Sequence, residues 1–513
     1  MNTKIQKVLV ANRGEIAIRI IRGCADAGIK SVAIYSECDR TAYHARLADE
    51  VHYIGPSPSV ESYLVQEKII EIAKKSKADA IHPGYGFLAE NADFAKLCEE
   101  NGIIFIGPKS ETIALLGDKL EARRTALKAK LPVVPGAEFD NSNSKNVNSI
   151  AEKVGYPVLI KAAAGGGGKG MRVVESEDKL SESIESAIRE AGSAFGDGRV
   201  YLEKFVVKPR HVEIQILADM YGHAVYLGER ECSIQRRHQK VIEESPSPII
   251  TPELRRKMGE AAVNIVRESK YVGAGTVEFL VDQNLNFYFL EVNTRLQVEH
   301  PVTEMVTGID IVREQSRIAE GKKLSFTQDD IKQNGHAIEC RIYAEDPEQG
   351  FMPSTGTIKQ YREPSGPGVR VDAGVVAGSE IPIYYDPIIA KLIVWGADRN
   401  ESIERTIRAL KEYRIAGLKT TIGFACAVMR SQNFRMGDYT TDFIEKEFPD
   451  KRFSCHIDDI KRKAAISAAV FEYLGRQKVV VDSSVGRAGN DSGRKGWLQY
   501  YRSRGVNRLG GSR

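Results

Sequence analysis

The first 107 residues alternate short apolar segments with amphipathic ones, and this alternation limits the folds open to the chain. Val8–Ala11 and Ser31–Tyr35 have the length of buried strands, and Glu15–Ala27 between them has helical spacing and is followed by Gly28. Strands that alternate with helices predict an open parallel sheet with helices on both faces. After the first strand comes Asn12-Arg13-Gly14-Glu15 in place of a GxGxxG fingerprint, which disfavours a dinucleotide enzyme.

From about residue 118 the pattern changes to consecutive strands. Pro157–Ala162 and Met171–Val174 flank a glycine-rich turn. Further elements are expected as strands over residues 201–206, 212–217 and 224–229, a helix over Glu253–Ser269, a hairpin over 276–300 and a helix over Glu401–Tyr413. The predicted fold class is a multidomain protein of mixed α/β and α+β type.

Length and composition narrow the class further. A chain of 513 residues is expected to hold two to four packed units, and 42% hydrophobic with 28% charged residues excludes collagen-like and wholly disordered proteins. The apolar runs are shorter than the roughly 20 residues of a membrane span, and the N-terminus lacks the apolar core of a signal peptide. Seven scattered cysteines without a CxxC pair predict buried thiols in a reducing compartment, so cytoplasm is the expected location.

The positive charge is concentrated at the end of the chain. Residues 451–513 hold 14 Lys or Arg against 5 Asp or Glu, a net charge of +9, whereas the whole chain carries +4. Residues 454–474 have the pattern of a helix, and the stretch from Ser483 is rich in Gly, Ser and Arg. We therefore expect a basic, partly disordered tail over 449–513, for which a docking segment and a disordered end are both open interpretations.

Four consecutive glycines, Gly165–Gly168, stand between Lys161 and Lys169. Glycines let backbone N–H groups turn toward an anion, and the lysines add positive charge for a phosphate. The segment is not a Walker A loop, because Met171 follows Gly170. A flexible hairpin turn is the alternative, but such a turn needs one or two glycines, so we favour a lid over a phosphate.

The hairpin over residues 276–300 brings two carboxylates together. Folding it about a turn at Asp282–Asn286 places Glu278 nearly opposite Glu291, and like charges across a strand pair are destabilising unless neutralised. A divalent cation such as Mg²⁺ or Mn²⁺ would neutralise them. The second strand is predicted over Phe287–Glu299, and because its side chains alternate between the two faces, one face carries a polar row about 25–30 Å long. That row consists of Glu291, Asn293, Arg295, Gln297 and Glu299. An ordinary solvent face would more often carry Thr, Lys and Ser, so we favour a reaction face over that alternative.

A third cluster lies over Cys232–Lys240, with three cations and a histidine within five residues. No aromatic residue is interleaved, so base stacking on nucleic acid is not indicated. Beside a phosphate loop and a metal hairpin, the cluster favours small anionic substrates.

Several long segments, in the same order, resemble the ATP-grasp superfamily and specifically biotin carboxylase. The matching segments are Val10–Ala17, His82–Asn91, Gly117–Lys119, the glycine loop, Arg210–Gln215, Gln235–Lys240, Glu291–Thr303 and Glu339–Pro347. The resemblance covers residues 6 to about 448. It implies a Rossmann-like N-terminal domain over 1–117, an ATP-grasp domain over 118–334 with a mobile lid at about 133–205, and a C-terminal biotin carboxylase domain over 335–448.

The resemblance also assigns roles by position. For ATP it implies Lys119, Lys161, Gly165, Gly166, Gly167, Gly168, Glu203, Lys204, Val206, His211, Gln235, His238 and Leu280. For two Mg²⁺ or Mn²⁺ ions it implies Glu278, Glu291 and Asn293. For bicarbonate and biotin it implies Lys240, Arg295, Gln297, Val298, Glu299, Arg341 and Tyr85. Within that set the catalytic residues are Lys240, Arg295, Glu299 as general base and Arg341 as the cation for the biotin enolate. Residues 438–444 match less well and receive no nucleotide contact.

The implied reaction is ATP- and bicarbonate-dependent carboxylation of biotin through carboxyphosphate, the first half-reaction of an acetyl-CoA, propionyl-CoA or pyruvate carboxylase. No Met-Lys-Met biotin-attachment signature occurs, so the expected partners are a carboxyltransferase subunit and a separate biotin carboxyl carrier protein. A homodimer within a larger complex is also expected, without membrane or nucleic acid, and the acceptor is left open. The alternative is another ATP-grasp ligase, such as a carbamoyl-phosphate synthetase fragment, although residues 295–299 together with Arg341 disfavour it.

Overall fold

The computed structural model describes residues 4–139, 147–162, 171–196, 198–450, 453 and 464–473. The chain divides into two units, Met1–Cys455 and His456–Arg513. In the second unit residues 464–473 are helical and exposed, which confirms that part of the helix expected over 454–474. The glycines Gly165–Gly168 and the stretch from Ser483 lie outside the described residues.

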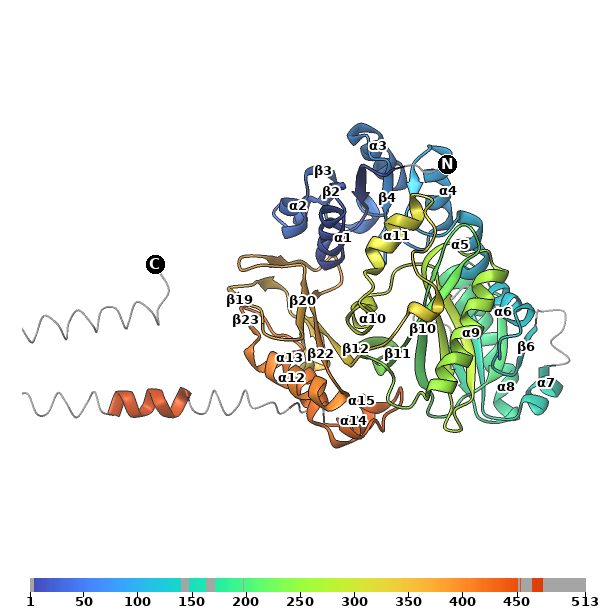
Figure 1. Ribbon diagram of the computed structural model, residues 1–513. Helices are drawn as coiled ribbons and strands as arrows, with labels where there is room; N and C mark the ends of the chain where they lie inside the picture. The colour runs from blue at the N-terminus through green and yellow to red at the C-terminus, as the bar shows by residue number, and fades with distance from the viewer. Residues whose placement is uncertain are drawn as a thin grey trace, which may run out of the picture. The chain divides into compact units, whose positions relative to one another are not determined.

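The N-terminal part is a five-stranded parallel sheet with helices on both faces, as predicted (Figure 1). The strand order is β3 (Glu50–Gly55), β2 (Lys30–Ser36), β1 (Lys7–Val10), β4 (Ala80–His82) and β5 (Ile104–Phe105). The helices are α1 (Gly14–Asp26), α2 (Tyr43–Leu47), α3 (Gln66–Ser76), α4 (Ala92–Glu100) and α5 (Ser110–Gly117). Leu9 packs in one core with α3 and α4, whereas Val8 and Val10 pack in another with α1, because successive strand residues face opposite sides.

The edge strand β3 was not predicted from the sequence. Among the described strands it pairs only with β2, and its residues Val51 and Tyr53 are 42% and 49% exposed, so it lacks the continuous apolar run of the central strands.

The largest sheet has eight antiparallel strands. Their order is β14 (Phe287–Asn293), β13 (Gly273–Val281), β10 (Arg210–Ala218), β11 (Ala224–Arg236), β12 (Gln239–Ser245), β15 (His336–Tyr343), β22 (Ile388–Gly396) and β20 (Val369–Ala373). Because β12 pairs with β15, the sheet runs through the predicted boundary between residues 334 and 335. The division into domains stays a prediction.

Helices cover this sheet and leave polar side chains at its centre. The helix α9 (Pro252–Glu268) packs on β10 and β11, and it begins where the Thr251 side chain accepts a hydrogen bond from the Leu254 N–H. The helix α12 (Arg399–Glu412) packs on β15 and β22. The other helices are α6 (Lys119–Lys128), α10 (His300–Thr307), α11 (Ile311–Ala319), α13 (Ile422–Arg430), α14 (Gln432–Met436) and α15 (Phe443–Glu447). Three short ribbons pair β16 (Glu345–Asp346) with β17 (Met352–Pro353), β18 (Gly356–Thr357) with β21 (Glu380–Ile381), and β19 (Gln360–Arg362) with β23 (Arg414–Ala416).

The segment predicted as a lid forms a sheet of its own. Its order is β6 (Gly136–Phe139), β9 (Val200–Lys204), β7 (Val158–Ala162) and β8 (Met171–Val174), with helices α7 (Val147–Val154) and α8 (Leu180–Phe195). Apolar residues of these elements, among them Ile160, Leu180 and Leu202, form a separate core. A small sheet with its own core can move as a body, which fits a lid.

The prediction that one strand reaches residue 299 is wrong. The strand β14 ends at Asn293, residues 294–298 are irregular, and Glu299 precedes the first residue of α10. The N–H of Thr294 donates to the carboxylate of Glu90 at 3.1 Å, so this backbone group bonds to a side chain from the N-terminal part and not to a neighbouring strand. The polar row is therefore a strand end followed by a loop.

One cysteine also differs from expectation. Cys426 on α13 is disulfide-bonded, whereas Cys24, Cys38, Cys98, Cys232 and Cys340 are free as predicted. The cysteine argument for a reducing compartment therefore does not extend to Cys426, and the cytoplasmic location stays a prediction. Among the described helices, none has the length and apolar character needed to cross a membrane.

Candidate active site

Two carboxylates face each other across the hairpin, as the sequence predicted. Glu278 on β13 is in register with Glu291 on β14. Burial alone would raise the pKa of Glu278, but Lys240 and His211 beside it hold that pKa well below its usual range. Burial and then the charge of Glu278 raise the pKa of Glu291. Glu278 is thus paired with cations, whereas Glu291 remains repelled by the like charge of Glu278.

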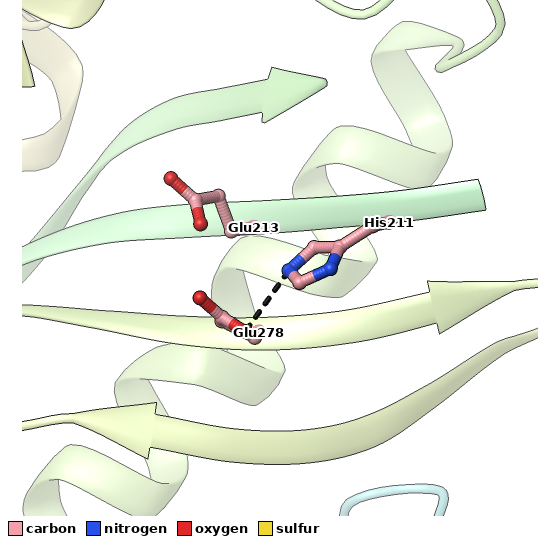
Figure 2. Close-up of side chains that lie close together, drawn as sticks. All are labelled: His211, Glu213 and Glu278. Carbon is pink, nitrogen blue, oxygen red and sulfur yellow. Dashed lines mark ion pairs between the residues drawn. The ribbon is translucent and has the colours of Figure 1, made fainter. Parts of the chain in front are cut away.

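His211 and Glu213 come from β10, two residues apart and on the same face as Glu278 (Figure 2). The Nε2 atom of His211 lies 2.9 Å from a carboxylate oxygen of Glu278. These three residues offer ligand atoms within 4.8 Å of one another. The carboxylate oxygens among these atoms suit Mg²⁺ or Mn²⁺, whereas His211 offers a nitrogen, and an ion at the opposed Glu278 and Glu291 would balance both of their charges.

Lys240 is the centre of a cluster of charged side chains, which we call the charge cluster. From β12 its Nζ lies 2.5 Å from Glu213, 2.8 Å from Glu278 and 2.7 Å from Glu299. Burial would lower the pKa of Lys240, but the three carboxylates raise it well above its usual value. The side chain therefore stays cationic and ties together groups from β10, β13 and the start of α10.

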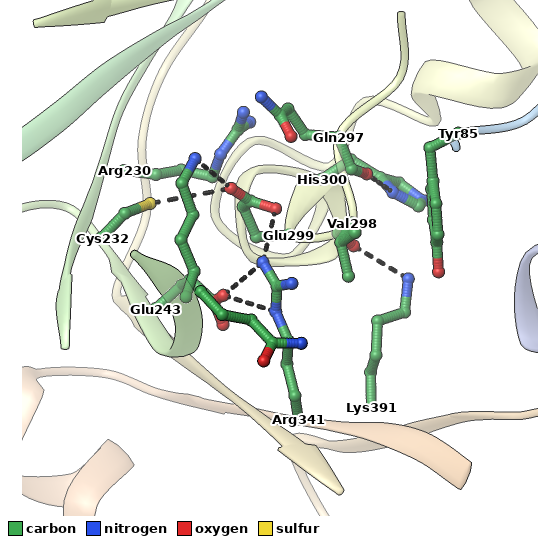
Figure 3. Close-up of polar contacts among 12 residues, drawn as sticks. Tyr85, Arg230, Cys232, Glu243, Gln297, Val298, Glu299, His300, Arg341 and Lys391 are labelled. Atoms are coloured by element: carbon green, nitrogen blue, oxygen red, sulfur yellow. Dashed lines mark hydrogen bonds and ion pairs between the residues drawn. The ribbon is translucent and has the colours of Figure 1, made fainter. Parts of the chain in front are cut away.

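Glu299 lies between the cations of Lys240 and Arg341, and Figure 3 shows its contact with Arg341. Besides Lys240, it accepts a hydrogen bond from Arg341 on β15 at 3.0 Å, and the Nε of Arg341 donates to Glu243 at 2.6 Å. Burial would raise the pKa of Glu299, but Lys240 and Arg341 hold it well below its usual range. Glu299 is thus ionised at neutral pH, as a proton acceptor must be before it acts.

The loop after β14 carries the remaining predicted residues into the same site. Arg295 donates to Asn293 at 3.0 Å, to Gln297 at 2.9 Å and to Glu90 at 2.9 Å. The side-chain amides of Asn293 and Gln297 in turn donate to Glu278 at 2.8 and 3.3 Å. The loop thereby connects Glu278, a predicted metal ligand, to Glu299.

The predicted nucleotide residues fall into two groups: those outside the lid sheet and those within it. In the first group, Lys119 begins α6, and burial lowers its pKa although Glu291 acts in the opposite direction. The side chain of Gln235 lies 3.0 Å from the Nδ1 of His211. Leu280 and Val206 are half-buried, and His238 is exposed in the turn between β11 and β12.

The second group belongs to the lid sheet. Lys161 forms an ion pair with Glu203 in which both side chains are buried. Lys204 donates to the carbonyls of Gly155 and Tyr156 at 2.8 and 3.0 Å, so its ammonium is engaged by the lid backbone. The ATP contacts of both groups stay predictions.

A cavity of about 480 Å³ adjoins Arg341. Its walls include Arg13, Glu15 and Tyr85 from the N-terminal part, and Arg295 and Val298 from the loop. The cavity is thus built from segments far apart in the sequence, and it meets the charge cluster at the Arg341 guanidinium.

Several residues of the cluster were not predicted. Arg230 on β11 is fully buried and lies 2.5 Å from Glu213, Glu243 pairs with Arg341, and Glu90 holds Arg295. Charged residues are seldom fully buried, so acids and arginines within apolar strands at Glu213, Arg230 and Glu243 were an available signal. Glu90 gave no such signal, because it lies outside any strand.

Fold and site together define an ATP-grasp ligase. The family model "Biotin carboxylase, N-terminal domain" matches residues 4–113, "Carbamoyl-phosphate synthase L chain, ATP binding domain" matches 118–327, and "Biotin carboxylase C-terminal domain" matches 339–446. A pyruvate carboxylase subunit of Methanothermobacter thermautotrophicus is 52% identical over 486 residues, 91% of this chain and 98% of that protein. The biotin carboxylase of Nostoc sp. is 53% identical over 443 residues, 86% of this chain and 99% of that protein.

A solved structure agrees with these relatives. The biotin carboxylase domain dimer of Hydrogenobacter thermophilus 2-oxoglutarate carboxylase, in complex with MgADP, ADP and bicarbonate, has a TM-score of 0.84 and 48% identity. The match covers 88% of this chain and 100% of that one. This chain belongs to the biotin carboxylase family, as the resemblance implied.

Proposed function

We propose that this chain uses ATP and bicarbonate to carboxylate biotin carried by a separate protein. The observation that carries the proposal is Glu299, a buried carboxylate held ionised between Lys240 and Arg341, where Arg341 also lines the cavity. The cluster of Glu299, Lys240 and Arg341 thus adjoins the cavity. This arrangement suits a reaction that forms a carboxyl donor at the cluster and uses it in the cavity.

The first step needs a proton acceptor and positive charge. Glu299 takes the proton of bicarbonate, whose oxygen then attacks the γ-phosphate of ATP to give carboxyphosphate and ADP. Lys240, Arg295 and the amide of Gln297 lie beside this carboxylate or in its loop and counter the developing negative charge.

A divalent cation fits the neighbouring carboxylates. Glu278 and Glu291, with Asn293 beside them, would hold Mg²⁺ or Mn²⁺. The ion would supply positive charge for the phosphates when bound. Lys119 and His211, which lie near the same carboxylates, would then contact the nucleotide.

We place the second step, the carboxylation of biotin, in the cavity. Carboxyphosphate breaks down to CO₂ and phosphate, the released phosphate accepts the proton of the ureido nitrogen of biotin, and that nitrogen attacks CO₂. The guanidinium of Arg341 is always cationic and would stabilise the enolate oxygen of biotin. Because a reactive intermediate must be kept from water, we assign the separate lid sheet the role of closing over the site.

Partners follow from the same reaction. We propose a homodimer of this chain within a larger complex that also holds a biotin carboxyl carrier protein and a carboxyltransferase subunit. The relatives named above come from a pyruvate carboxylase and from a 2-oxoglutarate carboxylase, so similar chains serve different acceptors. Identification of the biotinylated protein and transferase that co-purify with this chain would establish the acceptor.

The test is bicarbonate-dependent ATP hydrolysis, measured with and without free biotin. Stimulation by biotin that is lost in Glu299→Gln supports the proposal. Hydrolysis that depends on bicarbonate but not on biotin would favour another ATP-grasp ligase and would refute it.

A further inference from the structure

A second buried lysine lies next to Arg341. Lys391 on β22 is in register with Arg341 on β15, and it is fully buried. Two cations directly opposite each other on neighbouring strands repel, so each needs its own partners. Arg341 has Glu243 and Glu299, whereas Lys391 forms an ion pair with Glu15 at 3.2 Å.

The partners of Lys391 and Glu15 lie on the cavity wall. Lys391 donates a hydrogen bond to the carbonyl of Val298 at 2.9 Å, between Gln297 and Glu299 in the chain. The hydroxyl of Tyr85 donates to the other carboxylate oxygen of Glu15. Glu15, Tyr85 and Val298 all line the cavity (Figure 3 shows Lys391 pointing toward Val298 beside the Tyr85 ring).

Stability alone does not explain this pair. Desolvation of two charges is expensive, and a buried ion pair is often no more stabilising than apolar residues of the same volume. Burial raises the pKa of Glu15 to about 7 although Lys391 opposes that shift, so the pairing offsets only part of the effect of burial. Asp372, in register with Lys391 on β20, pairs with Arg370, and burial raises the pKa of Glu339 on β15 well above its usual range, so Glu15 is the carboxylate that pairs with Lys391.

We propose that Lys391 and Glu15 are positioning residues for the biotin half-reaction. Their ion pair holds the Val298 carbonyl on one side and the Tyr85 hydroxyl on the other, which fixes the cavity wall beside Arg341. Four segments meet there: the start of α1, the loop after β4, the loop after β14, and β22. The inference rests on the proposed function, because it takes the cavity as the site of biotin.

The decisive variant is the double substitution Glu15→Gln with Lys391→Met. It removes both charges at nearly constant volume, so it avoids the uncompensated buried charge that either single variant leaves. We expect thermal unfolding close to wild type, a biotin-stimulated rate at least about tenfold lower, and a smaller loss of biotin-independent ATP hydrolysis. Equal losses in both rates, or no loss, would overturn the proposal.

Tyr85→Phe covers the case in which the double variant does not fold. It removes only the hydroxyl that Glu15 holds, and we expect a KM for biotin raised about threefold or more at unchanged KM for ATP. An unchanged KM for biotin would count against the inference.

Lys7→Met is the matched control. Lys7 also bridges a carboxylate and a backbone carbonyl, at 2.9 Å from Glu50 and 2.7 Å from the Ser76 carbonyl, but in the N-terminal sheet and outside the cavity lining. It should keep both rates, and a selective loss of biotin stimulation in this control would overturn the inference. A wild-type enzyme without biotin stimulation would refute the proposed function and this inference together, whereas a stimulated wild type with an unaffected double variant would refute the inference alone.

Discussion

Replacing Lys240 by methionine tests the central arrangement of the site. The substitution keeps the length of the side chain and removes a charge that lies 2.5–2.8 Å from three carboxylates, those of Glu213, Glu278 and Glu299. Loss of one positioned group that stabilises developing negative charge costs about 10²–10³ in rate, or about 2.7–4 kcal/mol. We expect a decrease of this size in kcat/KM for bicarbonate.

The same substitution should change the pH dependence in a defined direction. Lys240 is the largest of the charges that lower the pKa of Glu299 against the effect of burial. Without it, Arg341 and Arg230 remain, but the pKa of Glu299 rises, so a smaller fraction of the carboxylate is ionised at low pH. The acid limb of the pH–rate profile should therefore move to higher pH.

Both effects can be measured in one assay. Bicarbonate-dependent ATP hydrolysis is followed from about pH 6 to about pH 9 in wild type, Lys240→Met and the control Lys7→Met. Thermal unfolding of each variant separates loss of activity from loss of fold. A decrease below about fivefold, or an acid limb that does not move, would refute the reasoning.

Three further predictions concern single carboxylates and the cavity. Glu291→Gln should raise the Mg²⁺ concentration for half-maximal activity about tenfold or more, and a chelator should abolish wild-type activity until Mg²⁺ or Mn²⁺ is added; an unchanged metal titration would contradict the assignment. Burial would raise the pKa of Glu244, but His336 and Arg399 lower it to about 2 from an unfolded value near 4.5, so its contribution is present above pH 4.5 and is lost as pH falls toward 2. Glu244→Gln should thus lower the free energy of unfolding by about 3 kcal/mol at pH 7, measured by chemical denaturation, and an equal loss at about pH 3 would count against this cause. Arg341→Lys keeps the charge but not the planar fork, so biotin stimulation should fall at least about tenfold while biotin-independent hydrolysis falls less; equal decreases would place Arg341 outside the biotin step.

Local pattern was sufficient where one short segment decides the geometry. The alternation of strands and helices predicted the parallel sheet, because period and length determine which segments can be buried strands. The register of Glu278 with Glu291 followed from the hairpin turn, since the turn fixes which residues face each other. The family resemblance added residue roles that no local pattern contained.

The same reasoning failed one residue beyond the strand. The period-two row from Glu291 to Glu299 assumed a continuous strand, but the Thr294 N–H bonds to Glu90, which lies about 200 residues earlier in the chain. Arg295, Gln297 and Glu299 still reach the site, but through a loop whose shape depends on that contact. No pattern within the hairpin could show it.

What the sequence by itself determined is thus the sheet type, the opposed carboxylates and the set of polar residues that carry the chemistry. What only the tertiary structure decided is which charges meet: Lys240 with three carboxylates, Glu299 between Lys240 and Arg341, and Lys391 with Glu15 at the cavity wall. The physical reason is the distance along the chain over which each effect acts. Periodicity and turn geometry act over a few residues, whereas the ionisation of a buried group depends on every charge within a few ångströms, wherever in the chain it originates.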